Sequence, residues 1–144
     1  MKKTFLFFIS ILLLAGCSPE LSIRTVEFAA MENNTLLSHS NSYSVGEIVY
    51  LVLEDVGSFE KDDNGKIKVD IDMTVIDFNN TILLNKTNML GESGYLNVTG
   101  DYLEFPYVNV KTETLVAGNY DIFVTVRDLV VNKSATQSAR FTLQ

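Results

Sequence analysis

The segment 66–77 alternates between apolar and polar residues with a period of two. Its apolar residues, at every second position, are Ile67, Val69, Ile71, Met73 and Val75. Successive side chains of a β-strand point to opposite faces, so this pattern predicts a strand with one buried and one solvated face. From residue 21 onward, no stretch of about 11 or more residues keeps the spacing of three and four that marks an amphipathic helix. The chain is therefore expected to be all-β.

Further strands are predicted where similar patterns recur between turn-forming Asn, Gly and Asp residues. They lie at 22–29, 48–53, 81–84, 95–98, 102–105, 120–127 and 138–143. Residues 48–53 are apolar throughout, which is typical of a central strand covered on both faces, whereas residues 32–44 are polar and predict a surface loop or an irregular first strand. Seven or eight short strands on 144 residues predict one domain of two packed antiparallel sheets.

The first 17 residues differ in character from the rest of the chain. Lys2 and Lys3 precede an apolar run at 5–14, which at about 1.5 Å per residue is too short to cross a membrane as a helix. This layout is typical of a secretory signal peptide. The run ends in Leu14-Ala15-Gly16-Cys17, which resembles the lipobox of prokaryotic lipoproteins.

This resemblance implies that residues 1–16 are a removed signal peptide and that Cys17 becomes the acylated first residue. A short tether at 17–21 and a β-sandwich at 22–144 would follow. Two or more acyl chains hold a protein stably on a membrane. We therefore expect export and a lipid anchor, on the outer membrane or on the outer face of the cytoplasmic membrane, depending on the host. The alternative is a leader cut elsewhere, with Cys17 as a free thiol.

A second motif, L-x-x-G-x-Y, is formed by Leu115, Gly118 and Tyr120 directly before an alternating segment. It resembles the tyrosine corner of immunoglobulin-like β-sandwiches, in which the tyrosine hydroxyl bonds back to upstream backbone. The likeness to immunoglobulin-like modules of bacterial and archaeal envelope proteins covers about 45–143 and implies an antiparallel sandwich of seven or eight strands. Ile122 replaces the cysteine of antibody domains and the chain has no tryptophan, so the disulfide-and-tryptophan version is excluded.

Charge and composition exclude several classes of function. Removal of Lys2 and Lys3 with the leader leaves nine of the 11 basic residues against 18 acidic ones. Such a balance argues against nucleic acid as a partner, because its binding depends on phosphate neutralisation by Lys and Arg. One histidine and one cysteine cannot form a zinc site of several His or Cys ligands or a disulfide framework. We expect no cofactor.

Asp62 and Asp63, followed by Asn64-Gly65, resemble half of a calcium-binding loop. The position that should hold a bidentate glutamate is Ile71 instead. A hairpin turn on Asn64-Gly65 explains the same residues better, because asparagine and glycine adopt the positive φ angles that a tight reversal needs. The sequence therefore favours a turn over a metal site.

Asp77 and Asp128 each lie where a predicted strand meets a turn. They could gather calcium between loops at one end of the sandwich, or form a carboxylate pair for glycoside hydrolysis, which needs a separation of about 5 to 10 Å. An aspartate at such a position more often bonds local backbone amides. We therefore predict no catalytic residue and no metal site. His39 is expected to be an exposed loop residue.

Tyr102 and Tyr107 flank Pro106, and Tyr95 lies just upstream. Aromatic side chains on loops and edge strands stack against sugars or fill pockets of a partner, so these three are the candidate recognition surface. The alternative is that Tyr102 or Phe105 fills the core and that Tyr107 covers an edge.

Five N-x-S/T triplets are potential glycosylation sites. They begin at Asn33, Asn79, Asn85, Asn97 and Asn132. Asparagine, serine and threonine also populate turns without modification, and we favour this interpretation.

These observations predict a lipid-anchored envelope protein that binds or adheres to envelope protein or glycan without catalysis. The main alternative is a structural spacer or assembly subunit that pairs through an edge strand. A calcium-dependent carbohydrate-binding module is a weaker alternative.

Overall fold

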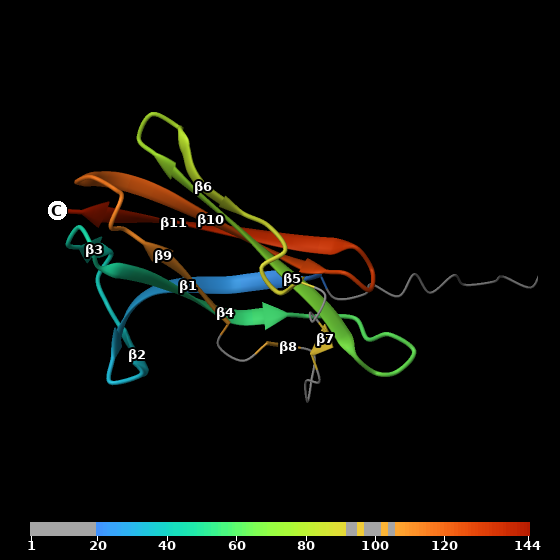
Figure 1. Ribbon diagram of the computed structural model, residues 1–144. Coiled ribbons are helices and arrows are strands. Elements are labelled where there is room, and N and C mark those ends of the chain that lie inside the picture. The colour runs from blue at the N-terminus through green and yellow to red at the C-terminus, as the bar shows by residue number, and fades with distance from the viewer. Residues whose placement is uncertain (1–19, 92–94, 97–101, 104–105) are drawn as a thin grey trace, which may run out of the picture.

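The computed structural model describes residues 20–91, 95–96, 102–103 and 106–144, which form eleven strands in two sheets (Figure 1). The five-stranded sheet contains β2 (Thr35–Ser38), β1 (Ser22–Glu32) and β4 (Ile48–Gly57), with β8 (Tyr102–Leu103) and β9 (Tyr107–Lys111) both paired to β4. The six-stranded sheet contains β3 (Ser42–Tyr43), β11 (Lys133–Leu143), β10 (Gly118–Asp128), β5 (Ile67–Asp77) and β6 (Ile82–Lys86), with β7 (Tyr95–Leu96) on β5. An all-β, two-sheet domain is therefore confirmed.

The core lies between the two sheets and follows the alternation of the sequence. In β5 the predicted apolar face is buried, and in β10 every second residue from Tyr120 to Val126 is buried as well. Phe141 of β11 is fully buried, and its ring stacks on that of Tyr120 with centroids 5.3 Å apart. The period of two thus predicts both the strands and their inner faces correctly.

Strand β4 is central, as expected, but it is not covered on both faces. Val49, Leu51 and Leu53 are fully buried, whereas Ile48 is exposed and Tyr50 is half-buried. Nothing in the described part of the chain packs over the outer face of the five-stranded sheet as a further layer. An apolar residue on this strand therefore does not have to be a core residue.

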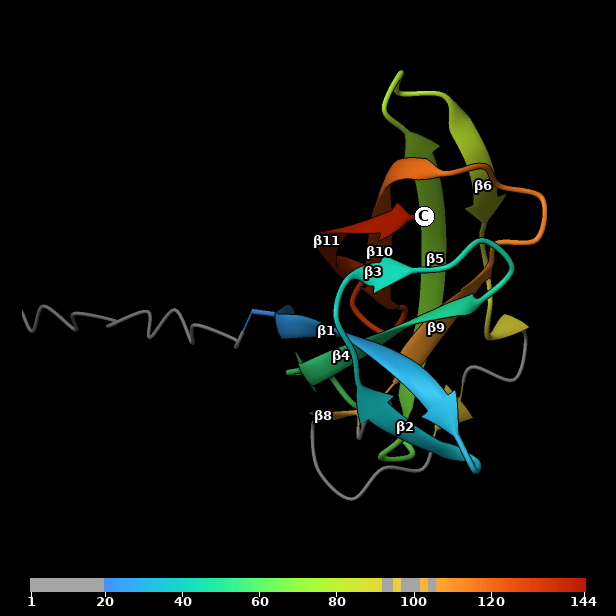
Figure 2. The same ribbon diagram turned by 90° about the vertical axis from the view of Figure 1, so that its left-hand side faces the viewer.

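The polar segment 32–44, expected to be a surface loop or an irregular first strand, contains two short strands, β2 and β3. Asn33 and Asn34 have φ angles of 48° and 62°, and they connect β1 to β2 in a two-residue hairpin turn. Asparagine tolerates this left-handed conformation better than most residues. After β2 the chain crosses to the other sheet, where β3 pairs in parallel with β11 (Figure 2). The segment is thus about half strand, and the expected seven or eight strands is an underestimate.

The turn at Asn64-Gly65 is confirmed, with a φ angle of 73° at Gly65 and a hydrogen bond of 2.9 Å from its amide to the carbonyl of Asp62. It is not the turn of a hairpin, because β4 and β5 belong to different sheets. The motif before β10 behaves as predicted, since the Tyr120 hydroxyl donates a hydrogen bond of 2.6 Å to the backbone carbonyl of Val116.

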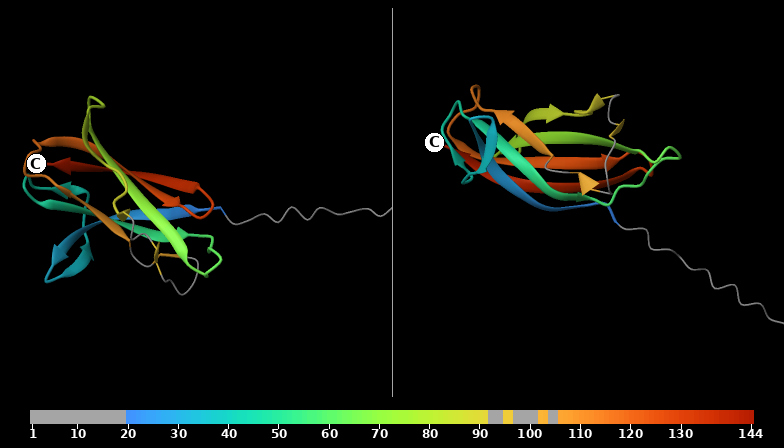
Figure 3. Two further views of the ribbon diagram at one scale, coloured as in Figure 1. Left: turned by 45° about the vertical axis from the view of Figure 1, so that its right-hand side comes forward. Right: turned by 90° about the horizontal axis from the view of Figure 1, so that it is seen from below.

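The described chain enters the domain and leaves it at opposite ends, as Figures 1 and 3 show. Leu21, the last residue of the expected tether, is buried in the core at the end of the domain where β1 begins. Each of the long strands has 10 or 11 residues. At about 3.3 Å per residue, the far end lies roughly 35 Å away.

Candidate functional site

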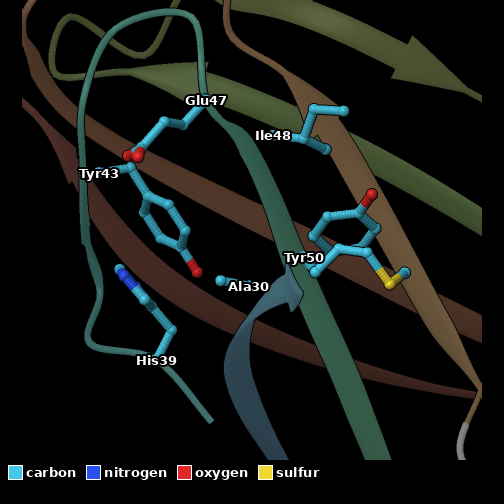
Figure 4. Close-up of a pocket in the computed structure, with 7 residues that line it drawn as sticks. Ala30, His39, Tyr43, Glu47, Ile48 and Tyr50 are labelled. Atoms are coloured by element: carbon cyan, nitrogen blue, oxygen red, sulfur yellow. The ribbon is translucent and has the colours of Figure 1, made fainter. Parts of the chain in front are cut away.

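A pocket opens where β1 separates from β4. Pairing of these two strands ends at Ala29 opposite Tyr50, whereas β1 continues for three more residues in its hairpin with β2. The hairpin therefore diverges from the sheet and leaves a space of about 230 Å³. Its lining residues are Ala30, Met31, His39, Tyr43, Glu47, Ile48 and Tyr50 (Figure 4).

One side of the pocket is polar and is held by the chain between β2 and β4. The Tyr43 hydroxyl donates a hydrogen bond of 3.0 Å to the carbonyl of Ala29, and the exposed His39 ring stacks on the Tyr43 ring at 4.6 Å. Glu47 accepts a hydrogen bond of 2.6 Å from the amide of Ser44. Burial, and secondly the negative charge of Glu47, raises the pKa of Tyr43 to about 12. Tyr43 is therefore a neutral structural group at physiological pH.

The other side of the pocket is apolar and continues over the outer face of the five-stranded sheet. Ile48 is 37% exposed, Met31 is 39% exposed and Tyr107 of β9 is 47% exposed. The rings of Tyr50 and Tyr107 lie 5.9 Å apart, so they form a pair on this face. We call Met31, Ile48, Tyr50 and Tyr107 the sheet patch.

A second pocket, of about 270 Å³, borders the sheet patch on the side of β2. It is lined by Glu27, Phe28, Ala29, Leu36, Leu37, Ser38 and Val52. Val52 lies directly opposite Tyr107 in the β4–β9 pairing, so this pocket adjoins the tyrosine pair. Exposed apolar side chains that flank pockets are typical of binding surfaces.

The side chains beside the first pocket include serine and histidine, whose contacts are local. The hydroxyl of Ser40 bonds to the backbone of Ser42, and His39 Nδ1 lies 2.7 Å from the carbonyl oxygen of Ser40. These contacts do not form the serine–histidine–carboxylate chain that nucleophilic catalysis requires. The pocket offers an apolar wall with one carboxylate and one imidazole at its rim.

The three predicted recognition tyrosines do not form one cluster. Tyr102 and Tyr107 both lie on strands paired to β4 and are 55% and 47% exposed, so neither of them is in the core. Their partners on β4, Gly57 and Val52, are five residues apart. Tyr95 lies on β7, which pairs with β5 in the other sheet. Tyr107 belongs to the sheet patch, and Tyr102 lies elsewhere. Phe105 lies outside the described residues.

The candidate metal-ligating aspartates bind backbone amides. Asp62 Oδ1 accepts hydrogen bonds of 2.9 Å from the amides of Asn64 and Lys66, and that from Lys66 contributes most to lowering the pKa of Asp62. Asp63 is exposed beside it. Asp77 Oδ1 accepts hydrogen bonds of 2.8 Å from the amides of Asn79 and Thr81. The carboxylates of Asp62 and Asp77 therefore stabilise turns.

Asp77 and Asp128 cannot share a site. Asp77 pairs with Tyr120, and Asp128 lies eight residues further along the same strand, which corresponds to about 27 Å. The idea of a calcium site or a catalytic pair built from both is therefore wrong. Across the described ranges, no three or more His, Cys, Asp or Glu side chains gather in a way that could hold a metal ion.

The acidic residues of β5 have a structural partner that the sequence analysis did not find. Arg127 Nη2 donates hydrogen bonds to Asp70 and Asp72, both at 3.1 Å, and to the side-chain oxygen of Asn88 at 2.8 Å. Asp70 Oδ1 also accepts hydrogen bonds from the amides of Ile71 and Leu90. The cluster ties the segment after β6 to the sheet.

Of the five sequons, the four that the structure describes all start at exposed asparagines. Asn33, Asn79 and Asn132 lie in turns, and Asn85 lies on β6, where its side chain accepts a hydrogen bond from Thr74. Asn97 lies outside the described residues. Their exposure is compatible with either interpretation of these triplets.

Comparison with protein families identifies the leader. Residues 1–18 match the prokaryotic membrane lipoprotein lipid attachment site. The protein is exported and lipid-anchored to a membrane. The anchor of this lipoprotein is the lipidated cysteine, and the chain has one cysteine, Cys17, which lies outside the described residues.

A search among curated proteins finds no match to the chain. In the described part of the lipoprotein, no helix is both long and apolar enough to cross a membrane.

Proposed function

We propose that this lipoprotein is a non-catalytic binding module that recognises an envelope protein through the sheet patch. An envelope glycan is the less favoured partner. The observation that carries the proposal is the open outer face of the five-stranded sheet. There, the sheet patch remains accessible between two pockets of about 230 and 270 Å³.

The composition of the sheet patch favours a protein partner. Tyrosine and methionine are enriched in protein interfaces, and tyrosine recurs among the residues that contribute most to binding. Beside the sheet patch, the exposed His39 and Glu47 lie at the rim of the first pocket, where they can hydrogen-bond to a partner without being buried. A glycan could stack on Tyr50 or Tyr107, but the neighbouring Ile48 and Met31 offer it no hydrogen bonds.

We also propose that the domain is an immunoglobulin-like β-sandwich. Support comes from the hydrogen bond between the Tyr120 hydroxyl and the Val116 carbonyl, and from the parallel pairing of β3 with the last strand. On this proposal, sandwich architecture explains why the outer face of one sheet is available for binding. It does not by itself specify the partner.

The test is capture of envelope proteins by the full acylated protein, with photo-crosslinking residues introduced on the surface. We expect Ile48→Glu and Tyr107→Ala each to reduce the yield of a specific cross-linked product at least about tenfold, because central interface residues contribute about 1.4 kcal/mol or more. The matched control is Phe123→Glu on the outer face of the other sheet, where Phe123 is 36% exposed, close to the 37% of Ile48. Equal yields from the Ile48 and Phe123 variants would refute this use of the sheet patch.

A second candidate function is assembly through β6. This strand lies at the edge of the six-stranded sheet and exposes Ile82 and Leu83, which are 62% and 42% exposed. An unprotected apolar edge can add a strand from another chain. Concentration-dependent oligomers in sedimentation experiments, removed by Leu83→Lys but not by Ile48→Glu, would favour assembly over the binding module.

A further inference from the structure

The packed domain begins very close to the lipid anchor. Leu21 is 4% exposed, and the Ser22 hydroxyl donates a hydrogen bond of 3.0 Å to the carbonyl of Gly57. The side-chain amide of Gln137 donates another, also of 3.0 Å, to the carbonyl of Ile23. These contacts fix the chain from Leu21 onward. Four residue steps separate Leu21 from Cys17, and such a length of chain spans at most about 14 Å.

Three exposed side chains surround a shallow depression next to this entry point. Arg24 of β1 and Asp55 of β4 form an ion pair with side chains that are 70% and 52% exposed. Tyr102 of β8 is 55% exposed and lines the same depression together with Ser22. We call Arg24, Asp55 and Tyr102 the anchor-end patch.

The anchor-end patch is not explained by the stability of the domain. An ion pair as exposed as Arg24–Asp55 contributes about 0 to 1 kcal/mol. Tyrosine is enriched where membrane meets water, because its ring is apolar and its hydroxyl is polar. Because the anchor keeps Ser22 within a short distance of the bilayer, the membrane surface lies within reach of this patch.

We propose that the anchor-end patch rests on the membrane that holds the lipid, with Tyr102 in the headgroup layer and the Arg24–Asp55 pair against zwitterionic phospholipid headgroups. The guanidinium of Arg24 complements the phosphate of such a headgroup, and the carboxylate of Asp55 complements its ammonium group.

The charge of the protein argues for zwitterionic rather than anionic lipid. The chain after the leader carries nine basic and 18 acidic residues, so an anionic surface repels it. The Arg24–Asp55 pair has no net charge and therefore fits headgroups that have none. The anchor raises the effective concentration of headgroups at the patch to about millimolar or higher, so weak individual contacts are sufficient.

The absence of tryptophan from the sequence provides a clean test. Tyr102→Trp places one fluorophore in the anchor-end patch, and Phe78→Trp places one at the far end, where Phe78 is 74% exposed in the turn after β5. Both variants of the full acylated protein are inserted into phosphatidylethanolamine–phosphatidylcholine vesicles that carry a shallow spin-label quencher. We expect a blue-shifted, strongly quenched emission from Tyr102→Trp and unchanged emission from Phe78→Trp.

A charge variant tests the headgroup chemistry separately. Asp55 has a φ angle of 47°, a conformation that asparagine also tolerates, so Asp55→Asn removes the charge without straining the backbone. In the Tyr102→Trp background, Asp55→Asn leaves Arg24 unpaired, and the ratio of quenching in anionic vesicles to quenching in zwitterionic vesicles should then rise. Equal quenching of Tyr102→Trp and Phe78→Trp would overturn the membrane contact. An unchanged lipid preference of Asp55→Asn would overturn the role of the ion pair. Neither result depends on the sheet patch, so the proposed function is tested independently.

Discussion

Asp128 provides the strongest test of whether the acidic residues of this protein are structural. The residue is 1% exposed, and both of its carboxylate oxygens accept hydrogen bonds from backbone amides. Oδ2 accepts one of 2.8 Å from Glu60, and Oδ1 accepts one of 2.9 Å from Val130 and a longer one of 3.4 Å from Val131. Asp128 thus joins the loop after β4 to the turn between β10 and β11.

Asp128→Ala should lower the free energy of unfolding by about 3 kcal/mol, since each of the two short hydrogen bonds to a charged acceptor contributes about 1.5 kcal/mol or more. For a domain of this size, that loss corresponds to a decrease in Tm of roughly 10 °C. Asp128→Asn should lose about half as much, because its amide keeps one acceptor oxygen. Asp63→Ala, which removes the same charge from an exposed position, should change stability by less than about 0.5 kcal/mol.

The measurements are urea and thermal unfolding followed by circular dichroism, with and without millimolar calcium. Because both carboxylate oxygens of Asp128 are already bonded, calcium should not raise the Tm. A loss below about 1 kcal/mol for Asp128→Ala would refute the structural role, since the part-buried amides of Glu60 and Val130 would then lose their acceptor at little cost. A calcium-dependent rise in Tm that disappears in Asp128→Ala would assign the residue to a metal site instead.

Two further predictions concern the six-stranded sheet. Tyr120→Phe should lower the free energy of unfolding by only about 0.5 to 1.5 kcal/mol in urea titrations, because Val116 is 71% exposed and water can replace the lost hydroxyl at its carbonyl; a larger loss would show that the hydroxyl organises the loop. Arg140 donates hydrogen bonds of 2.7 and 2.8 Å to Asp121 and lowers the pKa of that carboxyl. The pair therefore stabilises the fold above the unfolded carboxyl pKa of about 4, and the contribution disappears as the pH falls through the lower folded value. Asp121→Asn should cost less than about 1 kcal/mol at pH 7, and its stability difference from wild type should vanish in strong acid; a difference that persists there would contradict this account.

Local patterns predict those strands whose own residues alternate. Strands β5 and β10 were predicted almost to their ends because one face of each must be buried whatever its neighbours are. Strand β9 was missed although Val108 and Val110 alternate with exposed or half-buried residues, since five residues give a weak signal. The sequence does not predict β2, because its residues are mostly exposed and its backbone pairing holds it in place. It does not predict β3, because two residues are too few for an alternating pattern although Tyr43 is buried in the core.

The candidate site could be predicted only in part, because it depends on register. The position of Tyr107 next to Pro106 predicts that it belongs to a recognition surface, and Tyr107 does lie in the sheet patch. The apolar run at 48–53 predicts that Ile48 and Tyr50 are covered, since the sequence of β4 does not reveal that no layer covers its outer side. The first pocket arises from the place where β1–β4 pairing ends at Ala29, and no residue pattern around that position indicates the end of pairing. Asn33-Asn34 was the one local signal for the hairpin.

On the proposed binding function, the position of the sheet patch limits which partners it can reach. Tyr50 pairs with Ala29, which lies seven residues after the start of β1, or about 23 Å along the strand. Because the chain before Leu21 adds at most about 14 Å, the patch stays within roughly 40 Å of the acylated residue in any orientation of the domain. A partner recognised there must therefore be membrane-bound itself or occupy the layer next to the membrane. If the anchor-end patch holds the domain upright, the sheet patch faces along the membrane plane rather than away from it. This arrangement favours a neighbouring envelope protein over a soluble ligand.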